Sequence, residues 1–390
     1  MNADELAGRL VALRRALHRR PELSGKEERT AAVVASELRR IGLPVSAPVG
    51  GHGVVAEVPG AGRGGAILLR ADLDALPIAE ETGLPFASEH PGVMHACGHD
   101  GHAAMLVGAA ELLAAGDPPP RTVRLLWQPA EERGGGARAL IEAGVLEGAA
   151  AIFGGHIDPR FDTGVIAVTD GAVNASSDRF TIRVSGRGGH GARPQEARDA
   201  LLAAAHLVVA IQSIVAREIA PGRPAVVTVG RMEAGTAANV VAGDAVLSGT
   251  VRALDREVRE AIKTALGRVT ERIAAAHRCR GALEFAGGTP PVVNDPRLAA
   301  LAREAVRRIC GEAGLAAMSE PNLGAEDFGC YLEKIPGCYV RFGARRAGAE
   351  VHPPHTSRFD FDEAVLPIGA AYYAEVARLA GERLDEEGIR

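Results

Sequence analysis

Apolar residues in the first 176 positions follow two spacings. Short, wholly apolar runs predict buried strands, and longer stretches with apolar residues on one face predict helices. Asp4 can cap the first helix, and Gly42 ends the second. Helices are expected at residues 4–19, 27–41 and 103–113, and strands at 54–58, 66–71, 123–127 and 151–153. Buried strands joined by helices indicate a mostly parallel, doubly wound α/β sheet.

The pattern changes near residue 177. Phe180, Ile182 and Val184 alternate with polar residues, which is typical of a strand with one face in water. The elements expected beyond it are a helix at 194–217, strands at 226–229 and 245–251, a helix at 255–277 and a strand at 281–285. This β-α-β-β-α-β order predicts a ferredoxin-like module. The chain is therefore expected to form a discontinuous α/β/α domain, residues 1–176 and 289–390, with an inserted α+β domain, residues 177–288.

Composition narrows the class of protein. The 390 residues are 47% hydrophobic and carry a net charge of −5, which suits a folded chain of two domains without a basic stripe for nucleic acid. No apolar run approaches the ~20 residues that cross a membrane, and residues 1–20 lack the apolar region of a signal peptide. The five scattered cysteines argue against a disulfide framework. We therefore expect a cytoplasmic protein that binds neither nucleic acid nor membranes.

Metal-binding side chains gather in the segment His95-Ala96-Cys97-Gly98-His99-Asp100. Gly98 permits a tight turn, so that Cys97 and His99 can face one point. The expected helix begins just beyond, which places the cluster in a loop at a helix N-terminus, where partial positive charge favours a thiolate. Taken alone, however, a Cys-x-His pair is a weak signal and favours a buried thiol with hydrogen-bonded histidines over a metal site.

Three further segments bring similar side chains to the ends of expected elements. Glu131 and Glu132 follow the strand at 123–127, His156 follows the strand at 151–153, and His355 lies in a loop before a helix. Ligands bind at such strand ends in open α/β sheets. Together with Cys97 and His99, these nitrogen, oxygen and sulfur donors suit zinc, manganese, cobalt or nickel. A paired-metal site would activate water and polarise a carbonyl, and Glu131 could then act as general base and acid.

These segments and several others resemble the M20 metallopeptidase superfamily. The similarity is to its amidohydrolase branch, which includes hippurate hydrolases, N-acyl-amino-acid amidohydrolases and auxin-conjugate hydrolases. It covers nearly the whole chain, and the motifs occur in order: residues 70–78, 97–102, 128–132, 155–156, 175–180, 186–192, 326–328 and the His355 loop.

The resemblance implies a role for each matching residue. Cys97 would bridge two metal ions, and His99, Glu132, His156 and His355 would be the remaining ligands. His352 competes for the last position, although the spacing to Phe359 favours His355. Glu131 would be the general base and Asp72 a carboxylate that orients the site. His190 would reach into the active site of a neighbouring subunit, and Asn239 would lie near the substrate.

The implied activity is that of an aminoacylase-type, binuclear metal-dependent amidohydrolase. It would cleave the amide bond of N-acyl amino acids, such as N-acetyl or hippurate-like conjugates, with metal-activated water. Each subunit would hold two divalent metal ions, Mn²⁺ or Zn²⁺ before Co²⁺ or Ni²⁺. The inserted domain would act as a lid and pair the chains into a homodimer or a dimer of dimers. A metal-dependent dipeptidase or carboxypeptidase with the same site would cleave the same type of bond.

Two further hypotheses come from different classes of protein. A cysteine hydrolase with Cys97 as nucleophile and a histidine as base would leave Glu132, His156 and His355 without a role. A non-catalytic, metal-stabilised binding protein would need no general base, whereas Glu131 stands beside a candidate ligand.

Overall fold

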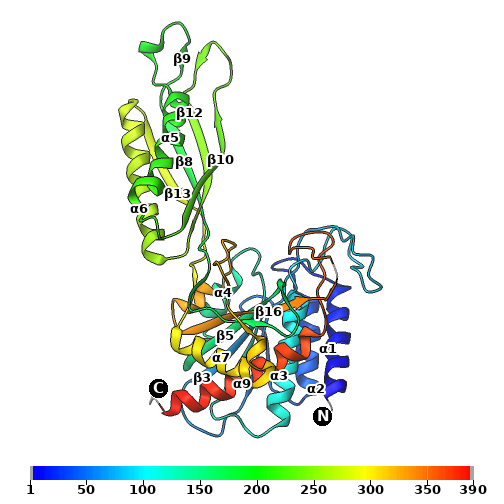
Figure 1. Cartoon of the computed structure of the whole chain (residues 1–390). Helices are drawn as coiled ribbons and strands as arrows, with labels where there is room; N and C mark the ends of the chain where they lie inside the picture. The colour runs from blue at the N-terminus through cyan, green and yellow to red at the C-terminus, as the bar shows by residue number, and fades with distance from the viewer. Residues whose placement is uncertain (1–2, 349, 387–390) are drawn as a thin grey trace. The chain divides into compact units, whose positions relative to one another are not determined.

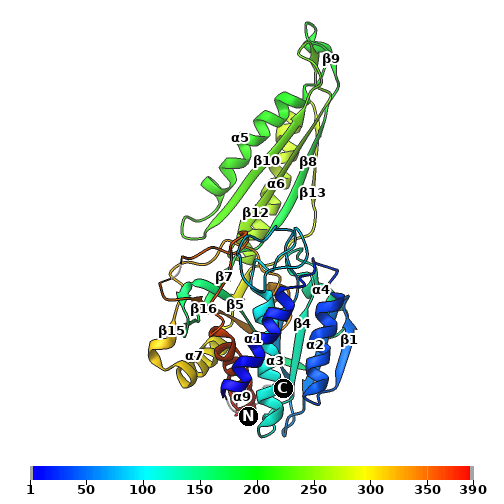
Figure 2. The same cartoon turned by 90° about the vertical axis from the view of Figure 1, so that its right-hand side faces the viewer.

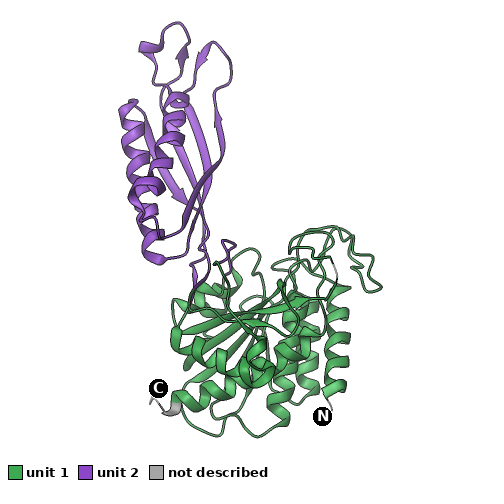
Figure 3. Ribbon diagram, viewed as in Figure 1, with its two compact units in different colours: residues 1–171, 294–320, 327–390 green, residues 172–293, 321–326 purple. Residues whose placement is uncertain are grey.

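The computed structural model describes residues 3–348 and 350–386, which fall into two compact units (Figure 3). Unit 1 contains Met1–Gly171, Asn294–Glu320 and Asp327–Arg390, and unit 2 contains Ala172–Val293 and Pro321–Glu326. Both boundaries expected from the sequence, 177 and 288, lie inside unit 2. Its short second segment, Pro321–Glu326, is an addition to the expected division.

An eight-stranded sheet forms the centre of unit 1 (Figure 1). Its order is β1-β2-β4-β3-β5-β16-β6-β15, and the inner pairs β4–β3, β3–β5 and β5–β16 are parallel. This confirms the mostly parallel sheet. The strands are β1 (Val45–Val49), β2 (Gly53–Val58), β3 (Ala66–Asp72), β4 (Val123–Gln128), β5 (Ala149–Asp162), β6 (Ile166–Ala167), β15 (Leu315–Ala316) and β16 (Gly337–Arg345). Every residue of β3 is buried, as a strand covered on both faces requires.

Helix α3 (His99–Ala115) packs against both α1 (Ala3–His18) and α9 (Val365–Glu386), and Figure 2 shows the three helices close together. The close approach depends on Gly108, because a Cβ there would lie 2.7 Å from the Cβ of Ala370 and 2.8 Å from Leu10 Cδ1. The helix starts at His99, earlier than the expected residue 103. His99, Asp100 and His102 therefore lie on its first turn and not in a loop. The other helices of unit 1 are α2 (Glu28–Arg40), α4 (Gly136–Glu142), α7 (Pro296–Cys310), α8 (Gly329–Leu332) and the 3-10 turn η2 (Glu312–Gly314).

Unit 2 is built on an antiparallel sheet with the order β10-β12-β8-β13. Phe180, Ile182 and Val184 of β8 pack against the helices, so the alternation in the sequence marks the buried face. The strand order and the two helices confirm the ferredoxin-like module. Its elements are β8 (Asp178–Ser185), α5 (Ala200–Glu218), β10 (Ala225–Ala234), β12 (Asp244–Ala253), α6 (Arg256–Ala276) and β13 (Arg280–Phe285). Smaller elements are β7 (Gly171–Asn174), β9 (Gly189–His190), η1 (Pro194–Glu196), β11 (Val240–Val241) and β14 (Val292–Asn294).

Helix α5 departs from one expectation drawn from the sequence. By length and composition alone it is apolar enough to cross a membrane, although no such segment was expected. The signal is weak, because core helices pass the same test. Leu207, Ile211 and Ile214 of α5 belong to the hydrophobic core of unit 2.

Candidate metal centre

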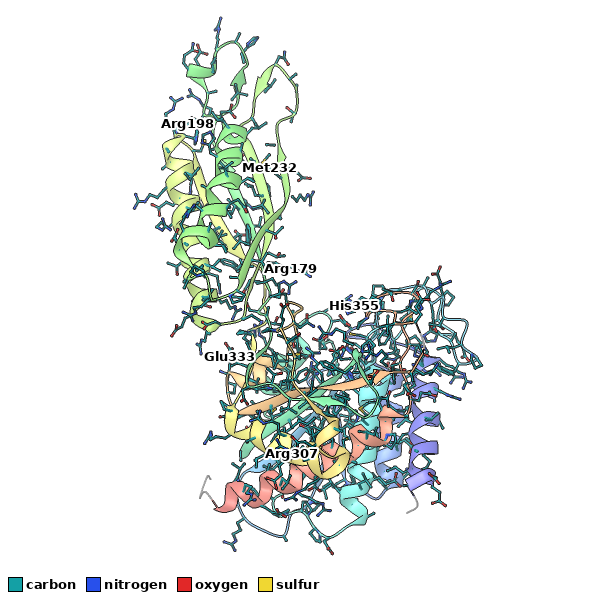
Figure 4. All side chains as sticks on the ribbon, viewed as in Figure 1. Arg179, Arg198, Met232, Arg307, Glu333 and His355 are labelled. Atoms are coloured by element: carbon teal, nitrogen blue, oxygen red, sulfur yellow. The ribbon has the colours of Figure 1, made fainter. Side chains whose placement is uncertain are left out.

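The expected metal ligands of unit 1 come from four separate segments. Cys97 and His99 flank Gly98, which adopts φ +89° at the start of α3. Glu132 follows β4, and His355 lies in the loop before α9, where Figure 4 labels it. His156 lies within β5 and not at its end, because β5 runs to Asp162. Gly154 is the last residue of β5 that pairs with β3, so His156 lies just beyond that pairing.

The structure brings these ligand atoms together in two overlapping groups. Those of Cys97, His99 and His156 lie within 4.8 Å of one another, and so do those of Cys97, Glu132 and His355. Cys97 Sγ lies 3.2 Å from His156 Nε2, and His355 Nε2 lies 3.3 Å from Glu132 Oε1. Cys97 thus belongs to both groups, which is the position a bridging ligand requires.

Hydrogen bonds leave specific atoms of the histidines available. His156 Nδ1 lies 2.6 Å from the carbonyl oxygen of Ile157 and donates to it, so Nε2 presents a lone pair toward Cys97. His99 Nδ1 lies 3.2 Å from Asp74 Oδ1, while its Nε2 is buried and has no hydrogen-bond partner among the described residues. Glu132 Oε1 is also buried, with His355 Nε2 3.3 Å away. A buried polar atom without a hydrogen-bond partner is rare, and a bound cation would satisfy His99 Nε2.

Burial and neighbouring charges shift the pKa values of the titratable side chains at this site in different directions. Burial alone would raise the pKa of Asp72, but His99, His102 and Arg70 hold it well below its ordinary value. Burial lowers the pKa of His156, and the neighbouring His102 adds to the effect, so this imidazole is neutral as a ligand must be. Burial opposes protonation of His99, yet Asp72 and Cys97 raise its pKa well above the ordinary value.

The protonation state of Cys97 differs from the sequence expectation. Burial and then the charge of Glu132 raise the pKa of this thiol, and they outweigh the opposing effects of His99 and His355. The protein environment alone therefore disfavours the thiolate. A bound cation would supply the missing stabilisation, since metal binding deprotonates its thiol ligands.

The structure distinguishes two aspartates beneath the ligands. Asp72 Oδ1 lies 2.6 Å from His102 Nδ1, and Arg70 Nη1 donates to Asp72 Oδ2 at 2.7 Å. Asp74 contacts the candidate ligands directly, because it bonds His99 and also accepts the backbone N–H of Glu132 at 3.0 Å. Sequence reasoning selected Asp72 and missed Asp74. The Asp-x-Asp spacing after a buried strand was the available signal, since it places both side chains on one face.

Glu131 lies beside the ligand groups. Its carboxylate offers an oxygen within 4.8 Å of the ligand atoms of His99 and Glu132, and the same holds toward Glu326 and Asp327. The N–H of Asp327 donates to Glu131 Oε1 at 3.3 Å. His352, the alternative last ligand, belongs to neither ligand group. Its Nε2 lies 3.9 Å from Glu350 Oε2. The geometry therefore favours His355 over His352.

His190 and Asn239 lie in unit 2, His190 on β9 and Asn239 in the turn just before β11. His190 pairs with Val240 between β9 and β11, and the N–H of Gly191 donates to the carbonyl oxygen of Asn239 at 2.7 Å. Both side chains are exposed. The structure thus brings these two residues together, and their role toward the metal centre stays a prediction.

Comparisons with known proteins identify the family of this chain. Residues 68–379 match the model of peptidase family M20/M25/M40. The chain is 40% identical over 375 residues to an N-acetyl-L-cysteine deacetylase of Bacillus subtilis, covering 96% of this chain and 88% of the relative. It is 40% identical over 380 residues to thermostable carboxypeptidase 1 of Saccharolobus solfataricus, covering 96% and 95%. A crystal structure of the Bacillus subtilis YXEP protein, described as a dinuclear metal binding peptidase from the M20 family, superposes with a TM-score of 0.86, at 38% identity over 97% of this chain and 99% of that one.

The chain therefore belongs to the M20 peptidase family. It is a metal-dependent amidohydrolase, an enzyme that hydrolyses amide bonds.

Proposed function

We propose that this enzyme is a binuclear aminoacylase that releases free amino acids from N-acyl amino acids. The observation that carries the proposal is the position of Cys97, whose sulfur belongs to two ligand groups at once. Cys97 could therefore be a ligand shared by two cations, and His99, His156, Glu132 and His355 would be the remaining residues that hold them. Mn²⁺ or Zn²⁺ suit this mixed donor set, and Co²⁺ or Ni²⁺ fit it as well.

Different side chains of the site have different roles in the proposed hydrolysis. Bound divalent cations lower the pKa of water and polarise a carbonyl oxygen. Glu131, beside Glu132 but outside the ligand pair, accepts the proton of the attacking water and delivers it to the leaving nitrogen. Asp74 fixes the ring of His99, and Asp72 holds His102, whose Nε2 accepts the N–H of Ile157 at 2.8 Å. These contacts hold the ligands in place before substrate arrives.

The names of two relatives support the proposed substrate class. One relative acts on an N-acetylated amino acid, as its name states, and another is an IAA-amino acid hydrolase of Arabidopsis thaliana, 38% identical over 374 residues. Both names describe an acyl group joined by an amide bond to an amino acid. We propose the same bond for this enzyme, without assigning one acyl group.

We further propose that the enzyme works as a homodimer, or as a dimer of dimers, in the cytoplasm. Unit 2 would form the pairing surface, and His190 would bind the developing oxyanion in the partner's active site, with Asn239 beside the substrate. The exposure of both side chains and the glycine-rich approach to His190 support this arrangement.

A panel assay tests the substrate class. The purified chain is incubated with Mn²⁺, Zn²⁺, Co²⁺ or Ni²⁺ and with N-acetyl, N-benzoyl and long-chain N-acyl amino acids, and release of the free amino acid is measured. Dipeptides and N-blocked peptides are included, because the similarity to a carboxypeptidase makes peptide hydrolysis the second candidate. Faster turnover of peptides than of every N-acyl amino acid would replace the proposal with that second function.

A further inference from the structure

The segment between α1 and α2 reaches across to the turn that carries Glu131 and Glu132. Glu27 Oε1 lies 2.8 Å from the backbone N–H of Ala130 and 2.8 Å from that of Gly25, and it accepts both hydrogen bonds. The Glu27 side chain is fully buried. We propose that Glu27 is a positioning residue for catalysis, which holds the backbone of Ala130 so that Glu131 faces the candidate metal centre. This inference rests on the proposed role of Glu131.

The turn needs such a restraint because of the conformation of Ala130. This residue adopts φ +54°, in the left-handed region where a Cβ is unfavourable. Its carbonyl oxygen accepts hydrogen bonds from the N–H groups of Gly135 and Gly136, both at 3.3 Å. Glu27 thus holds the peptide unit before Ala130, and these two N–H groups hold the peptide unit after it. Strained backbone of this kind persists only where surrounding contacts fix it, and such sites cluster around catalytic groups.

A second contact from the same segment fixes the next residue along the turn. The Ser24 hydroxyl donates to Asp74 Oδ2 at 2.6 Å, and the same oxygen accepts the N–H of Glu132 at 3.0 Å. The segment therefore restrains the backbone before Glu131 through Glu27, and the backbone after it through Ser24 and Asp74. Two restraints on opposite sides of Glu131 fix the backbone from which its side chain projects.

The carboxylate of Glu27 does not cap the N-terminus of α2. Glu27 stands at the N-cap position of α2 but makes no capping hydrogen bond with its side chain. Glu22 carries that task, because its carboxylate accepts the N–H of Thr30 at 2.8 Å and the Thr30 hydroxyl at 2.9 Å. Glu22 is thus a matched control: a nearby glutamate that supports the same helix, and whose side-chain hydrogen bonds run to α2 and not to the Ala130 turn.

The test compares Glu27→Leu, Glu27→Gln and Glu22→Leu in the metal-loaded enzyme. Leucine removes the acceptor at Ala130, so kcat should fall roughly 10- to 100-fold, the scale of a small misplacement of a catalytic group. KM and the metal content should stay close to those of the wild type. Glutamine keeps an acceptor and should restore most of kcat. Glu22→Leu should lower the melting temperature and leave kcat unchanged.

A second substitution separates positioning from folding. Glycine tolerates positive φ, so Ala130→Gly should recover part of kcat in the Glu27→Leu background by relieving the strain. Equal kcat in Glu27→Leu and wild type, or equal losses in Glu27→Leu and Glu22→Leu, would overturn the inference. Glu131→Gln is assayed alongside. If that variant keeps full activity, the proposed role of Glu131 itself fails; if it is inactive while Glu27→Leu is not, only the role of Glu27 fails.

Discussion

Cys97 Sγ and His156 Nε2 lie 3.2 Å apart although 59 residues separate them in the chain. The contact joins the start of α3 to the extension of β5 beyond β3. It places a thiol, whose pKa burial raises, against an imidazole whose pKa burial lowers. A thiol and a neutral imidazole at this distance make a poor ion pair, whereas both are good ligands once the thiol is deprotonated.

Replacement of Cys97 should distinguish a ligand from a nucleophile. Cys97→Asp should retain measurable metal binding and activity, because a carboxylate can also bridge two cations. Cys97→Ala should lose both. Metal content is measured by inductively coupled plasma mass spectrometry, and activity by release of the free amino acid. A covalent acyl-enzyme on Cys97, detected by protein mass spectrometry, would contradict the ligand assignment.

Asp74 should control metal affinity through His99. Asp74→Asn weakens the bond that orients the imidazole, and the affinity for the metal should fall roughly 10- to 100-fold, as for other residues that support metal ligands. Titration with Mn²⁺ or Zn²⁺ measures the change. As a control, Asp170→Asn alters an exposed aspartate that pairs with Arg303, and it should leave the affinity unchanged. The prediction fails if both variants bind metal as tightly as the wild type.

His18 should make stability depend on pH. Its ring nitrogens lie 2.8 Å from Asp100 and 3.2 Å from Glu80. Burial lowers the pKa of His18, but the hydrogen bonds and charge of these carboxylates raise it from 6.5 to about 9. The stabilisation is therefore fully present below pH 6.5 and is lost as the pH rises through about 9.

The shift corresponds to a contribution on the order of 3 kcal/mol to the free energy of unfolding. Denaturant unfolding of wild type and His18→Asn should show a stability difference that shrinks between about pH 6 and pH 10. Other titrating groups cancel in this comparison. A difference that stays constant across that range would show that folding does not raise the pKa of His18.

Mixed dimers test the proposed role of His190. His190→Ala and Glu131→Ala homodimers should both be nearly inactive. After the two variants are unfolded together and refolded, one site of each mixed dimer would have an intact Glu131 and receive an intact His190 from the other chain. Such a dimer should regain at most about half of the wild-type rate. Confirmed heterodimers that remain as inactive as their parents would show that His190 does not act across the subunits.

Local sequence patterns were sufficient for much of the fold and for the candidate ligands. The alternation of Phe180, Ile182 and Val184 marked the buried face of unit 2. The start of α3 was placed four residues late, at 103, because the polar side chains of its first turn hide the helical pattern. The contact from Glu27 to Ala130 could not be found in this way, because it joins residues 103 positions apart and depends on a strained φ angle. The pKa of Cys97 was also misjudged, because burial is a property of the assembled fold.

The most direct test of the account is a joint measurement of metal content and kcat in Glu131→Gln. The substitution keeps the shape of the side chain and removes its ability to accept a proton. The account predicts two divalent ions per chain, as in the wild type, and a kcat for N-acyl amino acid hydrolysis that is lower by about 10²-fold or more. Loss of metal from the variant, with kcat restored to the wild-type value when metal is added back, would contradict the account and make Glu131 a ligand.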